Sequence, residues 1–164
     1  MIFCSEDGLV CVNLLFEARE AIEKEMLLHH PYETGGILIG KYDENLRLAT
    51  VYLATASTKD SKHHSTTFRR GTNGIMEAIK HAQMHLSPEL HYVGEWHSHP
   101  NSSPTASYID LNQMQIFAKR SQLGIRTPLL LIVGGSPPKK LSWSFRLHRY
   151  KKLPLFLSLL NDTD

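Results

Sequence analysis

The chain has 164 residues, of which 41% are hydrophobic, and this suits a single compact domain over residues 1–164 with a buried core. Its 18 basic and 16 acidic residues leave a net charge of +2, which is too small to indicate a protein that binds nucleic acid. The chain lacks the apolar run of roughly 18 residues that a membrane span needs, and its start lacks the pattern of a signal peptide, so we expect a cytoplasmic protein without a membrane partner.

Hydrophobic periodicity predicts an alternation of strands and helices along the chain. In chain order, the predicted elements are a short strand or hairpin over 2–12, a helix over 13–29, strands over about 35–42 and 47–56, a helix over 73–86, a strand over 92–99, a helix that begins at Ser107, and strands over 129–133 and 141–150, followed by a tail of uncertain form. This order is compatible with an α/β domain built on a mixed sheet.

Apolar faces and turn residues delimit the first of these elements. Gly35 and Gly36 and the stretch 43–45 are expected to supply turns around the first long strand. The apolar side of the first helix consists of Leu14, Leu15, Ala18, Ile22 and Met26. These positions recur with the spacing of one helical face, so this face is predicted to pack on the core.

A polar stretch over residues 57–67 separates the second long strand from the second helix. Its serines, threonines, lysines and histidines predict a loop. Arg69 and Arg70 follow directly, and we expect this segment to line a substrate groove.

The chain has two cysteines, Cys4 and Cys11, which flank a turn at Asp7 and Gly8. They could face each other across a hairpin. In a reducing compartment, however, two cysteines are more simply free thiols, and this is the prediction that we adopt.

Two histidines on one strand, followed by a serine and an aspartate, form the most informative pattern in the chain. On a strand over 92–99, His97 and His99 project to the same side while Ser98 points away. The polar residues 101–106 predict a loop long enough to fold Asp110 over both imidazoles. Three nitrogen and oxygen ligands with an open fourth position are typical of catalytic zinc, whereas a closed structural site usually includes cysteines.

Simpler explanations exist for each part of this pattern. Ser107 and Asp110 also have the spacing of a capping box, which by itself would explain both residues. A second pair, His81 and His85, has the helical spacing of a zinc pair but lacks the accompanying glutamate, so we interpret it as surface histidines. The joint appearance of His97, the second imidazole, the serine and the aspartate at close, ordered spacing favours a metal site.

The run His97-Ser98-His99-Pro100, with its downstream serine and aspartate, resembles the complete signature of the JAMM metalloproteases, also called the JAB1/MPN+ family. The segment 31–40 is similar to that family's N-terminal segment, in which a glutamate precedes a glycine-rich strand. The resemblance covers the chain from about residue 12 to residue 150. It implies a single JAB1/MPN domain, a mixed β-sheet flanked by helices of the cytidine-deaminase-like kind.

The resemblance also implies roles for individual residues. One Zn²⁺ per chain would be held by His97, His99 and Asp110. Glu33 would be the general base that takes a proton from the attacking water and hands it to the leaving amine. Ser107 would stabilise the oxyanion. Glu95 is an alternative base or a support for a histidine ring, because strand alternation puts it on the same face, where many family members have an aromatic residue.

By the same resemblance, the protein would be an isopeptidase that cuts after the extended C-terminal tail of a ubiquitin-like protein. Its compact size, its Glu95-Trp96-His97 variant and the segment 66–71 resemble isopeptidases of bacterial antiphage operons of the CBASS type, which release a conjugated cGAS-like nucleotidyltransferase. Two alternatives stay open: a metal-free MPN scaffold, although such relatives lose motif residues, and a zinc hydrolase acting on a sulfur-carrier adduct. A zinc deaminase would need paired cysteines near the site, and these are absent.

Overall fold

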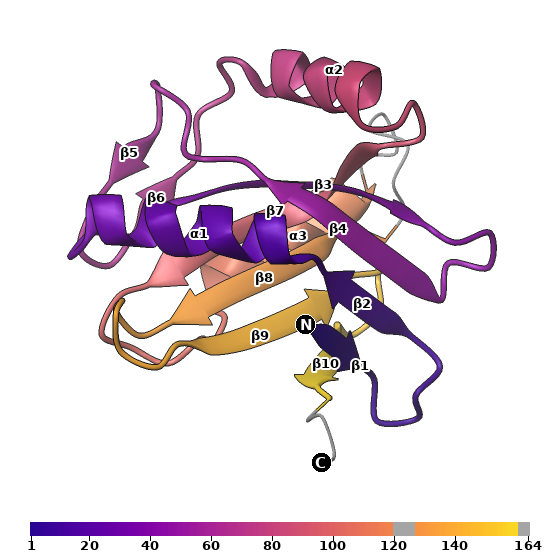
Figure 1. The fold of residues 1–164 in the computed structure, drawn as a ribbon. Coiled ribbons are helices and arrows are strands. Elements are labelled where there is room, and N and C mark those ends of the chain that lie inside the picture. The colour runs from indigo at the N-terminus through magenta and orange to yellow at the C-terminus, as the bar shows by residue number, and fades with distance from the viewer. Residues whose placement is uncertain (120–126, 161–164) are drawn as a thin grey trace.

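The computed structural model describes residues 1–119 and 127–160. Its elements are β1 (Ile2–Cys4), β2 (Cys11–Leu14), α1 (Phe16–His29), β3 (Gly35–Tyr42), β4 (Leu48–Ala54), β5 (Lys62–His63), β6 (Phe68–Arg69), α2 (Ile75–His85), β7 (His91–His99), α3 (Tyr108–Lys119), β8 (Leu129–Gly134), β9 (Ser142–Leu147) and β10 (Leu155–Leu159). Figure 1 shows their arrangement. None of the helices in the described ranges has the length and apolar character needed to cross a bilayer.

All strands in the described ranges except β5 and β6 form a closed barrel in the order β1-β10-β9-β8-β7-β3-β4-β2. The pairs β2/β4 and β7/β8 are parallel and the remaining pairs are antiparallel, so the predicted mixed sheet is confirmed. Its closure into a barrel was not predicted. Closure depends on β10, which pairs with β1 from a tail whose sequence has no clear strand pattern.

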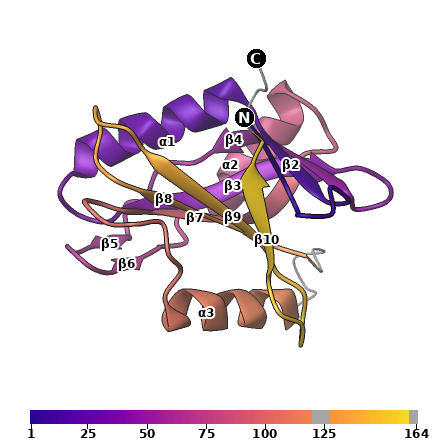
Figure 2. The same ribbon diagram turned by 90° about the horizontal axis from the view of Figure 1, so that it is seen from below.

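Helices cover both faces of this curved sheet, as Figure 2 shows for α1 and α3 on opposite sides. The buried face of α1 packs on the side that carries Leu38 and Trp96. The opposite side is covered by α2 over Ile37 and Ile39, and by α3, whose Met114 packs on β8. The domain therefore has its main core under α1 and two smaller ones under the other helices.

Several predicted boundaries differ from the structure. The first helix begins at Phe16 rather than at residue 13, because Cys11–Leu14 pairs with β4 as a strand. The strand predicted over 141–150 is β9, which ends at Leu147 rather than at residue 150. The polar stretch 57–67 is not all loop, since Lys62–His63 pairs with Phe68–Arg69 in a small separate hairpin.

The prediction of a turn at Gly35 and Gly36 is wrong. Both glycines are the first residues of β3 and are paired with β7. A Cβ atom on Gly35 would lie 2.8 Å from the Phe68 ring and 2.9 Å from Cα of His97, and one on Gly36 would lie 2.9 Å from the Trp96 indole nitrogen. The glycines are therefore needed for close approach between segments and not for a turn.

The prediction of free thiols is also wrong. The antiparallel register of β1 and β2 places Cys4 directly opposite Cys11, and the two residues form a disulfide with their Cα atoms 4.1 Å apart. The hairpin geometry that brings the two sulfur atoms together therefore prevails over the expectation of a reduced pair.

His148 supplies a prediction about acid stability. Its side chain is fully buried, and neither ring nitrogen has a hydrogen-bond partner among the described residues. Burial, reinforced by the charge of Arg146, lowers the pKa of His148 from 6.5 to about 4. The unfolded chain therefore binds a proton at higher pH than the native protein. The contribution of His148 to the free energy of unfolding should be constant above about pH 6.5 and fall by about 3 kcal/mol as the pH approaches 4.

Urea denaturation across this pH range should show a flatter profile for His148→Phe than for the parent protein. His85→Phe is the matched control, because the His85 ring is exposed on α2 and should leave the profile unchanged. Identical slopes for the parent and His148→Phe would contradict the assignment.

Candidate metal centre

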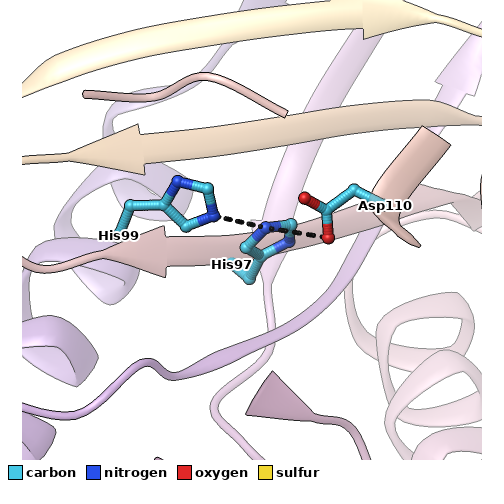
Figure 3. Close-up of side chains that lie close together, drawn as sticks. All are labelled: His97, His99 and Asp110. Atoms are coloured by element: carbon cyan, nitrogen blue, oxygen red, sulfur yellow. Dashed lines mark hydrogen bonds and ion pairs between the residues drawn. The ribbon is translucent and has the colours of Figure 1, made fainter. Parts of the chain in front are cut away.

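β7 presents three ionisable side chains on one face. His97 and His99 share this face with Glu95, while Trp96 and Ser98 are buried on the other side, as strand alternation predicts. The structure then brings Asp110, in the first turn of α3, over the same face (Figure 3).

The three predicted ligands converge to the dimensions of a metal site. Nε2 of His97 lies 3.1 Å from Nε2 of His99 and 3.5 Å from Oδ1 of Asp110. All three potential ligand atoms lie within 4.8 Å of one another. Ligand atoms around a tetrahedral zinc, with bonds of roughly 2.05 Å, lie roughly 3.3 Å apart. These side chains therefore fit a small divalent cation without rearrangement of the backbone.

His99 has the tautomer that such a site needs. Its Nδ1 lies 3.2 Å from the carbonyl oxygen of Ser103, and because a carbonyl only accepts, Nδ1 carries the proton and donates it. The lone pair of Nε2 is then directed at the site. Burial, together with the charge of His97, lowers the pKa of His99, which favours the neutral imidazole that binds metals.

Asp110 combines a local structural contact with its place at the site. Its Oδ2 accepts hydrogen bonds of 2.7 Å from both the amide and the hydroxyl of Ser107, and its own amide donates to that hydroxyl over 3.2 Å. The capping box is thus formed as well, and Oδ1 is left to face His97. Burial alone would raise the pKa of Asp110, but the neighbouring His97 and Ser107 outweigh it and hold the pKa below its usual range.

Glu33 lies on the same face through the pairing of β3 with β7. Gly35 pairs with His97, and the amide of Ser98 donates to the carbonyl of Thr34 over 2.8 Å. Continuing this register places Glu33 opposite His99, with its side chain on the face of the imidazoles.

The Glu33 side chain is only 9% exposed, and no hydrogen bond of its carboxylate is found among residues 1–119 and 127–160. Burial raises its pKa; His97 opposes this shift, and Asp110 adds to it. A carboxyl group with a raised pKa is suited to accepting and returning a proton near neutral pH.

Glu95, the alternative base, is engaged elsewhere. Its carboxylate accepts hydrogen bonds from Nε and Nη2 of Arg70 and, over 2.8 Å, from the hydroxyl of Tyr92. Tyr92 reaches this face because a β-bulge leaves Val93 without a partner on β3, so that strand alternation is reset. Burial raises the pKa of Glu95, and the contacts with Arg70 and Tyr92 oppose this shift. Because both carboxylate oxygens already accept hydrogen bonds, neither is free to take a proton from water. The sequence predicts Arg70 as a residue of a substrate groove but carries no signal for its ion pair with Glu95.

Comparison with known proteins agrees with this geometry. Residues 17–146 match the family described as prokaryotic homologs of the JAB domain. A CD-NTase/cGAS isopeptidase from Enterobacter hormaechei subsp. hoffmannii (strain UCI 50) is 37% identical over 142 residues, which cover 87% of this chain and 77% of that protein. A protein of the same name from Vibrio cholerae serotype O1 is 27% identical over 138 residues, which cover 82% of each. The solution structure of a Desulfitobacterium hafniense protein, 18% identical, has a TM-score of 0.61 over 88% of each chain and shares the fold.

Removal of a single ligand should weaken metal binding sharply. We expect His97→Ala and Asp110→Ala each to lose at least about a hundredfold in zinc affinity, because two remaining ligands bind the ion far more weakly than three. Titration with zinc, followed by metal analysis after dialysis, measures this loss. His85→Ala, which removes an exposed histidine on α2, is the control and should bind like the parent. Unchanged affinity in both ligand variants would exclude this site.

Proposed function

The chain belongs to the family of prokaryotic homologues of the JAB domain, and we propose that it is a zinc-dependent isopeptidase that releases a cGAS-like nucleotidyltransferase from the protein to which its C-terminal tail is conjugated. The observation that carries this proposal is the convergence of His97, His99 and Asp110 beside the buried carboxylate of Glu33. The names of the relatives from Enterobacter and Vibrio support the choice of substrate. In this proposal the protein acts in the cytoplasm as part of antiviral defence.

In this mechanism His97, His99 and Asp110 would hold one zinc ion. When bound, zinc supplies a Lewis acid that makes water more acidic and polarises the scissile carbonyl. The chain's own contribution is a rigid face: β7 fixes both imidazoles, the Ser103 carbonyl sets the tautomer of His99, and the capping contact with Ser107 fixes the carboxylate of Asp110.

Glu33 would take a proton from the attacking water and return it to the leaving amine. Its buried carboxylate lies on the face of the two imidazoles, and its raised pKa suits a group that holds a proton between the two transfers. The Ser107 hydroxyl donates to Asp110 in the structure. It would rotate toward the substrate to stabilise the oxyanion, a contact worth roughly 3 kcal/mol.

An extended protein tail suits the surroundings of this site. The hairpin of β5 and β6 stands apart from the barrel as a separate pair of strands. The Phe68 ring of this hairpin lies against Gly35, which pairs with His97. A tail in extended conformation could pair with an edge of this hairpin by backbone hydrogen bonds and so reach the metal site. A ubiquitin-like tail would meet the same requirement. A metal-free scaffold is the weaker alternative, because every residue of the motif is present and three of them converge.

The direct test is hydrolysis of an isopeptide conjugate. We expect zinc-loaded protein to cleave a cGAS-like nucleotidyltransferase whose C-terminus is joined to a lysine side chain of a reporter peptide. Gel electrophoresis and mass spectrometry of the products would locate the cut at the isopeptide bond. Chelation should stop cleavage and added zinc should restore it. Failure of the zinc-loaded protein on this conjugate, with hydrolysis of small amides instead, would point to a different hydrolase.

Exchange of single carboxylates should separate the two glutamates. Glu33→Gln should lower kcat by roughly a thousandfold while zinc stays bound, because the amide cannot accept the proton. Glu95→Gln should keep most of the turnover, since the Glu95 carboxylate is already bonded to Arg70 and Tyr92. An active Glu33→Gln together with an inactive Glu95→Gln would reverse the assignment.

A further inference from the structure

The hairpin of β5 and β6 bonds to both backbone groups of Glu33. The amide of Glu33 donates to the carbonyl of His64 over 2.8 Å. The carbonyl of Glu33 accepts a hydrogen bond of 2.9 Å from Nδ1 of His63, which must carry the proton because a carbonyl cannot donate. Figure 1 shows this hairpin beside the C-terminal end of α1. Thus a segment distant from the motif in sequence holds both peptide groups that flank the Cα atom of the proposed base.

The ring of His63 is itself fixed by its neighbours. It stacks on the ring of His29, with centroids 4.1 Å apart and planes 6° from parallel, and the Phe68 ring lies at 5.2 Å. Nε2 of His29 lies 3.1 Å from Oε1 of Glu25. The imidazole that bonds to Glu33 therefore has little freedom to turn.

Glu25 connects this stack to the segment just before β3, which carries the base. Its carboxylate is buried, and Oε1 accepts hydrogen bonds from the hydroxyl of Thr34 at 3.0 Å and from the amide and hydroxyl of Ser57 at 3.0 and 2.7 Å. Thr34 directly follows Glu33, and Ser57 lies where the chain leaves β4 toward the hairpin. On its other side, the amide of Thr34 donates to the hydroxyl of Ser98 over 3.0 Å.

We propose that His63 is a positioning residue for the Glu33 carboxylate, with its ring held in place by His29 and Glu25. The inference rests on the proposed role of Glu33 as the base. Among the described residues, the Glu33 carboxylate makes no hydrogen bond of its own, so its location relative to the metal site is set through its backbone. The contacts of His63 and Glu25 converge on residues 33 and 34, and small displacements of a catalytic group are costly to the reaction.

The test is a set of substitutions at one position. His63→Ala should lower kcat on the isopeptide conjugate by roughly ten- to a hundredfold. KM and zinc affinity should not change, because a tail paired with the hairpin would bond to its backbone, and the His63 side chain is not proposed to touch either the substrate or the metal. His63→Asn should recover most of kcat, since its side-chain amide can donate to the same carbonyl. His63→Phe, which keeps a ring against His29 but has no donor, should be as slow as His63→Ala.

His64→Ala is the matched control. His64 bonds to Glu33 through its backbone carbonyl, which the substitution retains, so kcat should stay near that of the parent. Hydrogen exchange gives a second readout that is independent of turnover. The amides of residues 33–36 should exchange faster in His63→Ala and His63→Phe than in His64→Ala or His63→Asn.

The other possible outcomes would each overturn the positioning role of His63 or the proposed role of Glu33. A rise in KM with unchanged kcat in His63→Ala would overturn the proposal in favour of a substrate contact, and a lower melting temperature with unchanged kcat would reduce His63 to a structural role. If Glu33→Gln is inactive while His63→Ala and His63→Phe turn over like the parent, the inference fails and the proposed function stands. If Glu33→Gln is fully active, the proposed role of Glu33 fails first.

Discussion

The antiparallel register between β3 and β7 is the constraint on which the rest of the site depends. It pairs Gly35 with His97 and so puts Glu33 on the face that carries both imidazoles. A slip by one residue would turn Glu33 to the opposite face. The pairing is possible only because position 35 has no side chain, since a Cβ atom there would collide with the backbone of β7 and with Phe68. The glycine is thus part of the site without any chemical role.

A second constraint brings Asp110 to this face. After β7 the chain runs through residues 101–106, which lie against the end of β8. The amide of Gly135 donates to the carbonyl of Ser102 over 2.9 Å. The loop also approaches Gly134 so closely that a Cβ atom there would lie 2.7 Å from the nitrogen of Pro104. This fixed loop starts α3 above the imidazoles. One oxygen of Asp110 then bonds at the start of the helix while the other faces His97, so helix capping leaves one carboxylate oxygen available to the candidate metal site.

Partly buried charges and polar groups set the surroundings of the site. Arg70 and Glu95 are 19% and 12% exposed, and their ion pair joins the hairpin of β5 and β6 to β7. Glu25, on α1, accepts hydrogen bonds from Ser57, ahead of this hairpin, and from Thr34, just before β3. Buried ion pairs add little net stability because desolvation opposes their attraction, but they restrict the arrangements that the chain can adopt. In this protein they specify where a short two-stranded hairpin lies relative to the metal site.

The sequence by itself determined what depends on neighbours along the chain. The alternation of β7 over residues 95–99, the three candidate metal ligands, the helical face of Ile22 and Met26 and the surface placement of His85 all follow from residue type and spacing. Only the tertiary structure decided the closure of the barrel by β10, the pairing of Cys4 with Cys11, and the contacts of Arg70 and His63. These contacts join segments whose mutual position depends on packing and register, and local periodicity carries no information about which distant polar groups will meet.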